Sequence, residues 1–248
     1  MFKTIAEATE AVGGLSEPSK MPSFGWSISA LRCSTGMKLR KIANSVCSIC
    51  YALKGRYIFK VVREAHERRY QKWKTNRKVW REAMTHLMHH QKHLLDNGKV
   101  FLKDEDAPVF RWFDAGDLQG KEMLDDINQI AFASPHVTFW LPTKEYNVVS
   151  IYKRTHAIAP NLCIRVSAPF KNSNSILDRH ENTSSAYDDL WEVEGEEGTF
   201  VKEKRKGDDE EEKLRRVRVC VAPWQGGQCL SCRDCWDKTV KEVVYPAH

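Results

Sequence analysis

The stretch "PVFRWFDAGD", from Pro108 to Asp117, is a short apolar run that ends in polar residues. The same pattern recurs in "HVTFWLPTKE" from His136 and in "NLCIRVSAPF" from Asn161, at offsets of 28 and 25 residues. Helix-like stretches follow the first two runs, at residues 120–132 and 145–158. A strand, a helix and two loops occupy about that length, so the repeat predicts βαβ units and a parallel sheet.

Further elements extend this pattern in both directions. The alternating "SFGWSIS", residues 23–29, predicts a first strand, and "VRVCVAP", residues 217–223, predicts a later strand of the same sheet. Residues 59–74 and 78–95 predict two helices. We therefore expect an α/β fold with one domain, residues 1–248. Its parallel sheet is expected to be TIM-barrel-like, whole, partial or distorted, with cysteine-rich loops at the barrel mouth.

Charge is unevenly distributed along the 248 residues, whose net charge is +6. Residues 181–212 contain thirteen Asp and Glu against four Lys and Arg, whereas residues 56–99 contain twelve Lys and Arg against four Asp and Glu. Because residues 171–216 break the strand-helix pattern and are low in apolar residues, we expect an acidic, solvated insertion with a mobile tip there.

Composition also restricts the compartment. No run of about eighteen apolar residues is present, so no membrane span is expected. The start, "MFKTIAEATEAVGG", lacks the apolar region of a secretory signal, which predicts a cytoplasmic protein. In a reducing compartment, eight cysteines indicate metal or redox chemistry rather than disulfides.

Seven of the eight cysteines fall into two groups, while Cys163 lies in an apolar strand and is expected to be a buried small hydrophobe. The first group follows the first predicted strand, and the second lies near the end of the chain in and before "CLSCRDCW". The first cysteine group is Cys33, Cys47 and Cys50, and the second cysteine group is Cys220, Cys229, Cys232 and Cys235.

The spacing within the second group favours an iron–sulfur cluster. A C-x2-C-x2-C run lets a tight loop place three thiolates on separate irons, and Cys220 is a natural fourth ligand for a [4Fe–4S] cluster. Zinc sites more often combine two C-x2-C pairs, so zinc is the alternative. The first group can hold a second cluster or complete a site with the second group. One site or two are both consistent with the spacing.

Polar residues follow each of the three repeated strands. Asp114 and Asp117 follow the first, Thr143 and Lys144 the second, and Ser167 ends the third. Because the carboxyl ends of parallel strands line the site in such folds, Asp114 and Lys144 are candidate catalytic residues. The alternative is that the aspartates cap the next helix.

Three other features have structural as well as functional interpretations. Arg165, in the middle of a strand, would face the sheet interior and need a carboxylate such as Asp114.

Histidines crowd one helix, but a solvated face is favoured over a zinc site. These are His86, His89, His90 and His93. The basic helices contain interleaved aromatics that are expected in the core, although they would also suit nucleic-acid stacking. These are Tyr70, Trp73 and Trp80.

Four motifs carry a resemblance to a known family. They are "CSICYALKGRY" (47–57), "FRWFDAGDL" (110–118), "LPTKEY" (141–146) and "CLSCRDCW" (229–236). Through them the chain resembles a family of bacteriophage proteins, the gene product 88-like proteins, over residues 22–236 without the acidic insertion. The resemblance implies a phage-encoded, TIM-barrel-like iron–sulfur protein that acts in the bacterial cytoplasm.

The arrangement is also distantly similar to radical S-adenosylmethionine enzymes, which have cysteines after the first strand of a partial barrel and an extra cluster near the C-terminus. Those enzymes carry C-x3-C-x2-C, whereas this chain has thirteen residues between Cys33 and Cys47 and two between Cys47 and Cys50. No glycine-rich stretch for the methionine moiety is obvious. The likeness covers the architecture and does not extend to S-adenosylmethionine as a cofactor.

Together these patterns predict an iron–sulfur protein whose cluster at the barrel mouth serves electron transfer, or reductive or radical chemistry. Such an enzyme would act with a redox partner or on a small-molecule substrate. The alternative is a zinc-stabilised protein whose basic helices bind nucleic acid.

Overall fold

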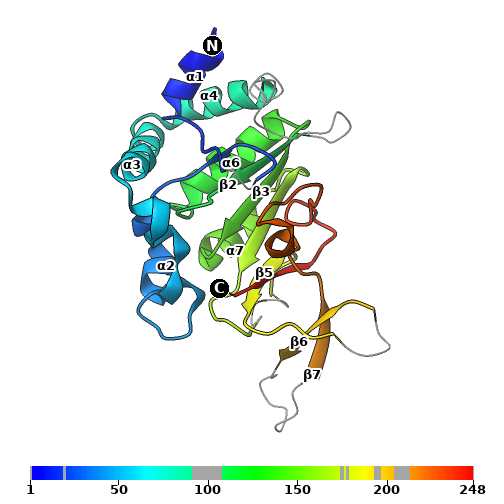
Figure 1. Cartoon of the computed structure of the whole chain (residues 1–248). Coiled ribbons are helices and arrows are strands. Elements are labelled where there is room, and N and C mark those ends of the chain that lie inside the picture. The colour runs from blue at the N-terminus through cyan, green and yellow to red at the C-terminus, as the bar shows by residue number, and fades with distance from the viewer. Residues whose placement is uncertain are drawn as a thin grey trace.

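The computed structural model describes residues 2–18, 21–90, 108–173, 176, 179–192, 197–203 and 213–247 (Figure 1). Within these ranges, strands and helices alternate between residues 109 and 167, as the sequence predicts. No helix in these ranges has the length and apolarity needed to cross a membrane.

One six-stranded sheet organises the fold. Its strands lie in the order β1-β2-β3-β4-β5-β8, and every neighbouring pair is parallel. Their bounds are β1 Gly25–Trp26, β2 Val109–Trp112, β3 Thr138–Thr143, β4 Leu162–Ser167, β5 Thr183–Tyr187 and β8 Glu242–Pro246. The predicted α/β class and parallel sheet are confirmed. Closure into a barrel is not shown, since β1 and β8 end the strand order of the described sheet.

Helices fill most of the connections between these strands. The α-helices are α1 Ile5–Ala11, α2 Ser34–Leu39, α3 Lys60–Thr75, α4 Arg77–His89, α6 Lys121–Ala133 and α7 Tyr146–Thr155. Short 3-10 helices are η1 Ala30–Arg32, η2 Val46–Ile49, η3 Tyr51–Leu53, η4 Gly55–Ile58 and η6 Ala222–Gln225. Helices α3, α4, α6 and α7 occupy the predicted positions. Residues 91–95 of the second predicted helix lie outside the described ranges.

The two faces of the sheet are covered differently because side chains alternate along each strand. On the helix face, Phe110, Trp112 and Phe139 pack in one buried cluster with residues of α4, α6 and α7. On the loop face, Val109 and Trp140 pack instead with the segment that contains the second cysteine group. Figure 1 shows α6 and α7 on one side of the strands and this orange-to-red segment on the other.

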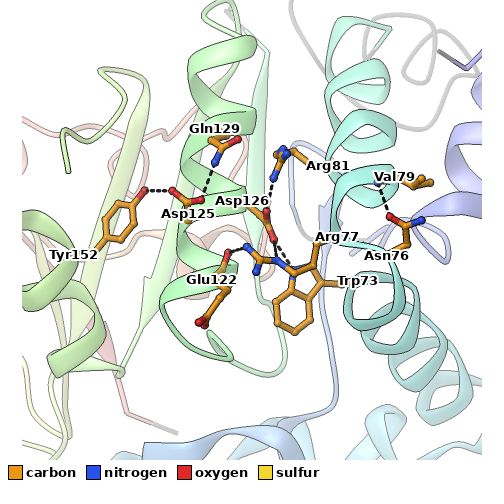
Figure 2. A network of polar contacts seen from close by, with 10 residues as sticks. All are labelled: Trp73, Asn76, Arg77, Val79, Arg81, Glu122, Asp125, Asp126, Gln129 and Tyr152. Carbon is orange, nitrogen blue, oxygen red and sulfur yellow. Dashed lines mark hydrogen bonds and ion pairs between the residues drawn. The ribbon is translucent and has the colours of Figure 1, made fainter. Parts of the chain in front are cut away.

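A buried ionic network joins α6 to the turn between α3 and α4 (Figure 2). Asp126 of α6 is fully buried and accepts from Arg77 Nε at 2.7 Å, Arg81 Nη1 at 2.8 Å and Trp73 Nε1 at 2.9 Å. Three donors around one carboxylate offset the cost of removing its charge from water. The predicted core aromatics of the basic helices are confirmed. Tyr70, Trp73 and Trp80 are each at most 8% exposed, so their rings are not available for stacking on bases.

The C-terminal third differs most from the sequence-based expectation. Residues 171–216 include β5, which belongs to the main sheet, and a hairpin of β6 (Thr199–Glu203) and β7 (Lys213–Val217). The predicted late strand 217–223 contributes one parallel bridge, from Val219 to Val244 of β8. Val201 of β6 packs against Val244, so the hairpin covers β8.

Candidate functional site

Asp114 lies directly after β2, at the carboxyl edge of the sheet, and is held by three hydroxyl groups. Ser27, directly after β1, donates to one carboxylate oxygen and accepts from the Asp114 amide at 3.0 Å. Tyr57 donates to the other carboxylate oxygen at 2.9 Å, and Tyr51 donates to the Asp114 carbonyl at 2.5 Å. The preceding Phe113 has a φ of 53°, a conformation that is costly for a bulky residue and that clusters at functional turns.

Gly116 allows this turn to close against the chain after β1. Its φ is 82°, and a Cβ atom there would lie 2.7 Å from the Ile28 carbonyl oxygen. The Ile28 amide in turn donates to the Ala115 carbonyl at 3.2 Å. A side chain at position 116 would therefore separate the two segments that position Ser27 and Asp114.

Asp117 is buried at the same edge, and none of the basic side chains in the described ranges is bonded to it. It accepts from the Thr143 hydroxyl at 2.6 Å, the Lys144 amide at 2.9 Å and the Leu118 amide at 2.8 Å. Burial raises the pKa of this carboxyl to about 6, although these hydrogen bonds act to lower it. A carboxyl group that titrates near neutrality beside strand ends is a candidate proton donor or acceptor.

Neither aspartate caps the following helix, contrary to the structural alternative. Helix α6 has Gly120 as its N-cap, with no side-chain cap hydrogen bond. Asp114 and Asp117 instead join loops that follow different strands.

Glu145 connects the end of β3 to the loop that carries the first cysteine group. Its carboxylate accepts from the Thr35 amide at 2.8 Å and from the Thr35 hydroxyl at 3.0 Å. Because Cys33 is the N-cap residue of α2, this contact fixes the first cysteine of the group relative to the sheet.

The three thiols of the first cysteine group lie close to one another in a desolvated environment. A Cβ atom built on Gly36 would lie 3.7 Å from Cys33 Sγ and 3.6 Å from Cys47 Sγ. Burial raises the pKa of the Cys33 thiol, and Asp117 and the Cys50 and Cys47 thiolates raise it further. Burial also raises the pKa of Cys47.

Lys144, the candidate catalytic lysine, faces the same group. Its ammonium lowers the pKa of Cys47, against the larger effect of burial. The backbone amide of Lys144 is bonded to Asp117, so the lysine and the buried carboxyl are fixed to each other.

The second cysteine group is also assembled from thiols that interact. Burial raises the pKa of Cys229 to about 11, and the Cys220 thiolate raises it as well. Burial raises the pKa of Cys220 and Cys232, whereas backbone amides lower it, from Ala222 for Cys220 and from Asp234 for Cys232. Amides that donate to sulfur favour the thiolate form.

Cys235 is the most enclosed member of this group. Its Sγ lies 3.0 Å from the Tyr245 hydroxyl of β8, and burial raises the pKa of its thiol to about 12. The next residue, Trp236, donates to the Phe110 carbonyl at 3.0 Å and packs edge-on against Trp140 at 5.1 Å between ring centroids. These contacts seat the cysteine loop on the loop face of the sheet.

Arg165 clamps this loop, and the predicted pairing with Asp114 is wrong. The guanidinium is fully buried in β4, as expected for the sheet interior. It donates instead to backbone carbonyls, because the loop crosses directly over β4. The distances are 3.0 Å to Asp234, Asp237, Val240 and Thr183, and 3.3 Å to Cys235.

Arg111 of β2 lies near the second cysteine group and near the tyrosine that binds the Asp114 carbonyl. Its guanidinium sits 4.4 Å from the Trp140 ring centroid, and Nη1 is 3.5 Å from the sulfur of Met21. Its charge lowers the pKa of Tyr51, at the first group, and of Cys229, in the second, against the larger effect of burial on each. A single cation thus lies near Tyr51, the neighbour of Cys50 in sequence, and near Cys229.

The predicted metal sites can be compared with the cysteine sulfurs that the structure brings together. All eight cysteines are free, and in the part of the chain that the structure describes no three His, Cys, Asp or Glu side chains are grouped so that they could hold a metal ion. The chemistry of the second group fits a cluster, since four soft sulfur donors interact and two accept amide hydrogen bonds. The ligand assignments remain predictions.

The histidines of α4 make structural contacts. His89 Nε2 lies 2.9 Å from the Ala133 carbonyl, and the His86 and His90 rings are 4.5 Å apart between centroids. His93 lies outside the described residues. These contacts accord with the structural interpretation of the helix.

Sequence reasoning did not select Glu145, Tyr57 or Arg111 as site residues. Glu145 and Tyr57 stand inside the quoted motifs "LPTKEY" and "CSICYALKGRY", so each had a local signal. Arg111 also stands inside a quoted motif, "FRWFDAGDL", but its place beside Tyr51 and Cys229 depends on how the strands are ordered.

Comparison with known proteins finds one family. A family model described as gene product 88 matches residues 3–238. No curated protein and no solved structure matches the chain.

Proposed function

The chain belongs to the gene product 88 family, and we propose that this member is an iron–sulfur protein that performs electron transfer or reductive chemistry. The second cysteine group, Cys220, Cys229, Cys232 and Cys235, would hold a [4Fe–4S] cluster on the loop face. Such a cluster supplies a one-electron redox centre. The first cysteine group would hold a second centre at the carboxyl edge.

One observation carries the proposal. The C-x2-C-x2-C run and the distant Cys220 interact electrostatically on one face of the sheet, and amides of Ala222 and Asp234 donate to two of the sulfurs. Hydrogen bonds to ligand sulfurs and restricted solvent access are the means by which proteins set the potential of such centres. Arg165 holds residues 234–237 in place through their carbonyls, so the segment that carries Cys235 is fixed to β4.

The carboxyl edge supplies groups that suit a small-molecule substrate. Tyr57 and Ser27 orient the Asp114 carboxylate, which can accept a hydrogen bond from a substrate. Lys144 presents an ammonium beside Cys47 and can bind an anionic group. Asp117, with a pKa of about 6, can hold or release a proton near neutrality.

The test is anaerobic purification followed by an absorbance spectrum, with iron, sulfide and zinc quantified per chain. A brown protein with about four irons supports one cluster, and about eight irons support two. A colourless protein with stoichiometric zinc contradicts the proposal and makes the cysteines a structural zinc site.

Variants then assign the ligands. The triple variant C229A/C232A/C235A is expected to lose the iron of the second group, and C33A/C47A/C50A any iron of the first. Cys163→Ala is the matched control, because Cys163 is a buried cysteine outside both groups. Equal iron in all three variants contradicts the assignment.

A further inference from the structure

We propose that the surface formed by residues 31–63 docks an acidic protein electron carrier, which delivers electrons to the cysteine sites. We call it the basic apolar surface. This inference rests on the proposed function, since a carrier is needed only if the chain holds a redox centre. It adds the partner and the place where the partner binds.

The centre of the surface is unusually apolar for exposed residues. Leu31, Tyr51, Ile58, Phe59 and Val61 are each between 55% and 71% exposed. They come from η1, η3, η4 and the start of α3, which pack against one another in sequence order. Exposed apolar side chains gathered on adjoining elements mark interaction sites in soluble proteins.

The rim of the surface is cationic. No Asp or Glu occurs anywhere between Pro18 and Arg63. The exposed cations are Lys38, Arg40, Lys41, Lys54, Arg56 and Arg63. The next acidic residue, Glu64, pairs with Lys60 at 3.8 Å, and Glu67 pairs with Arg32 at 2.6 Å, so neither offsets these charges. The complementary partner is therefore acidic.

The first cysteine group lies within this surface. Cys47 lies in η2, Cys50 lies between η2 and η3, and Tyr51 links the surface inward. The Tyr51 ring is 59% exposed, whereas its hydroxyl donates to the Asp114 carbonyl at the sheet edge. A carrier docked here would stand beside the sulfurs, so the electron has a short path.

The apolar centre favours a protein over other partners. Nucleic-acid interfaces are more polar and more strongly charged, whereas protein interfaces combine an apolar core with a polar rim. A second copy of this chain would bring the same cations against themselves if the same surface met across a two-fold axis, which is unfavourable. An acidic protein satisfies both the apolar centre and the charge.

The proposed step is the transfer of one electron. One electron passes from the reduced carrier to the oxidised centre, so the carrier is oxidised and the centre is reduced. No covalent bond forms or breaks.

The experiment measures reduction of the anaerobically purified chain by an acidic plant-type ferredoxin, pre-reduced, in a stopped-flow instrument. The second-order rate constant is followed against ionic strength. The test variant is K41E/K54E. The control is R154E/K241E, which makes the same charge change at exposed positions next to the amino ends of β4 and β8, on the opposite edge of the sheet.

We expect K41E/K54E to lower the rate constant at low salt by about tenfold, because steering by complementary charge changes association rates on that scale. The control should change it less than about twofold, and the difference should shrink above physiological salt, where the Debye length falls below about 8 Å. Val61→Asn should lower the rate with little change in its salt dependence.

Dithionite separates the two proposals. If dithionite reduces no centre in any variant, the proposed function fails. If dithionite reduces all variants normally while the ferredoxin rate is unaffected by K41E/K54E, only the docking proposal is overturned. Binding of a single-stranded DNA 20-mer that is lost in K41E/K54E, with an unaffected ferredoxin rate, overturns it in favour of nucleic acid.

Discussion

The two faces of the sheet are held together in different ways. The helix face is closed by a continuous apolar cluster that includes Trp26, Trp80 and Trp112, all fully buried, with one ionic network around Asp126 at its margin. The loop face has a smaller apolar cluster and depends on the guanidinium of Arg165. Apolar packing tolerates small adjustments, whereas a polar clamp works only with its full set of partners.

Because of this difference, substitutions on the two faces are expected to have different effects on stability and on bound metal. The helix face contains neither cysteine group, so its residues are expected to affect folding alone. The loop face and the carboxyl edge contain both groups, so changes there that release a cysteine loop should affect folding and bound metal together. Four predictions test this separation.

The largest effect is expected for Arg165→Met. The change leaves five backbone carbonyls, including those of Asp234 and Cys235, without their buried donor. Removing one partner of a buried charged network costs about 3 to 5 kcal/mol. Urea unfolding should show this loss, and iron per chain should fall as well, because the loop that carries the second cysteine group is released.

Arg154→Met is the control, since Arg154 is exposed on α7. An exposed substitution changes stability by about 0.5 kcal/mol or less. If Arg165→Met unfolds easily but keeps its iron, the clamp does not position the cysteines.

The second prediction concerns pH and compares two buried aspartates. Asp126 is paired with two arginines, whereas Asp117 accepts from a hydroxyl and two amides. The pKa of Asp117 is about 6 in the folded protein against 3.8 for an ordinary aspartate, because of burial. The folded state therefore binds this proton more tightly than the unfolded state does.

The free energy of unfolding of the metal-free protein should fall by about 3 kcal/mol as pH rises from about 4 to about 6. This value follows because each unit of difference between the folded and unfolded pKa corresponds to about 1.36 kcal/mol. Below the unfolded pKa this contribution is fully present, and above about pH 6 it is lost. Asp117→Asn keeps the oxygen that accepts from Thr143 and Leu118 and should remove that part of the slope. Urea unfolding of both proteins between pH 4 and 7 measures it. If the free energy of unfolding of the variant has the same pH dependence, a group other than Asp117 causes it.

The third prediction tests the helix face. Asp126→Asn removes the charge that Arg77 and Arg81 neutralise, and its amide group cannot accept from all three donors (Figure 2). We expect the free energy of unfolding to fall by about 2 kcal/mol, which is in the range for hydrogen bonds to charged groups. Iron per chain should stay unchanged.

Asp125→Asn is the matched control for this change. Asp125 is the neighbouring carboxylate, bonded to Gln129 and Tyr152 rather than to a cation. The free energy of unfolding of Asp125→Asn should fall by about 1 kcal/mol. Loss of iron in Asp126→Asn would contradict the separation of the two faces.

The fold was predictable where the signal was local. Strands β2, β3 and β4 contain apolar runs, and α3, α4, α6 and α7 have helical periodicity, so both were placed from sequence. Strand β5, "TSSAY", has no apolar run, and it becomes a strand because β4 and β8 pair with it on either side. Strand β8 lies after the last cysteine, where no repeat pointed to it.

The candidate site was predictable in part for the same reason. Asp114 and Lys144 lie at strand ends, as their positions after apolar runs indicated, and spacing alone defined both cysteine groups. The partners of Arg165 were not predictable, because its acceptors are main-chain carbonyls, which carry no residue-specific signal, and all but that of Thr183 lie about 70 residues further on. Long-range polar contacts of this kind are decided by packing.

The smallest expected effect comes from Trp236→Phe, which tests what else holds the cysteine loop. The phenyl ring keeps the edge-on contact with Trp140 but loses the donor to the Phe110 carbonyl. One buried neutral hydrogen bond contributes about 1 kcal/mol. Trp224→Phe is the control, because Trp224 is 65% exposed and lies on η6. Urea unfolding and iron per chain are measured for both. Since Arg165 still binds its five carbonyls, iron should be retained in Trp236→Phe. If iron falls as far as in Arg165→Met, the indole hydrogen bond to the Phe110 carbonyl positions the loop as much as the guanidinium does, and the polar clamp of the loop face extends beyond Arg165.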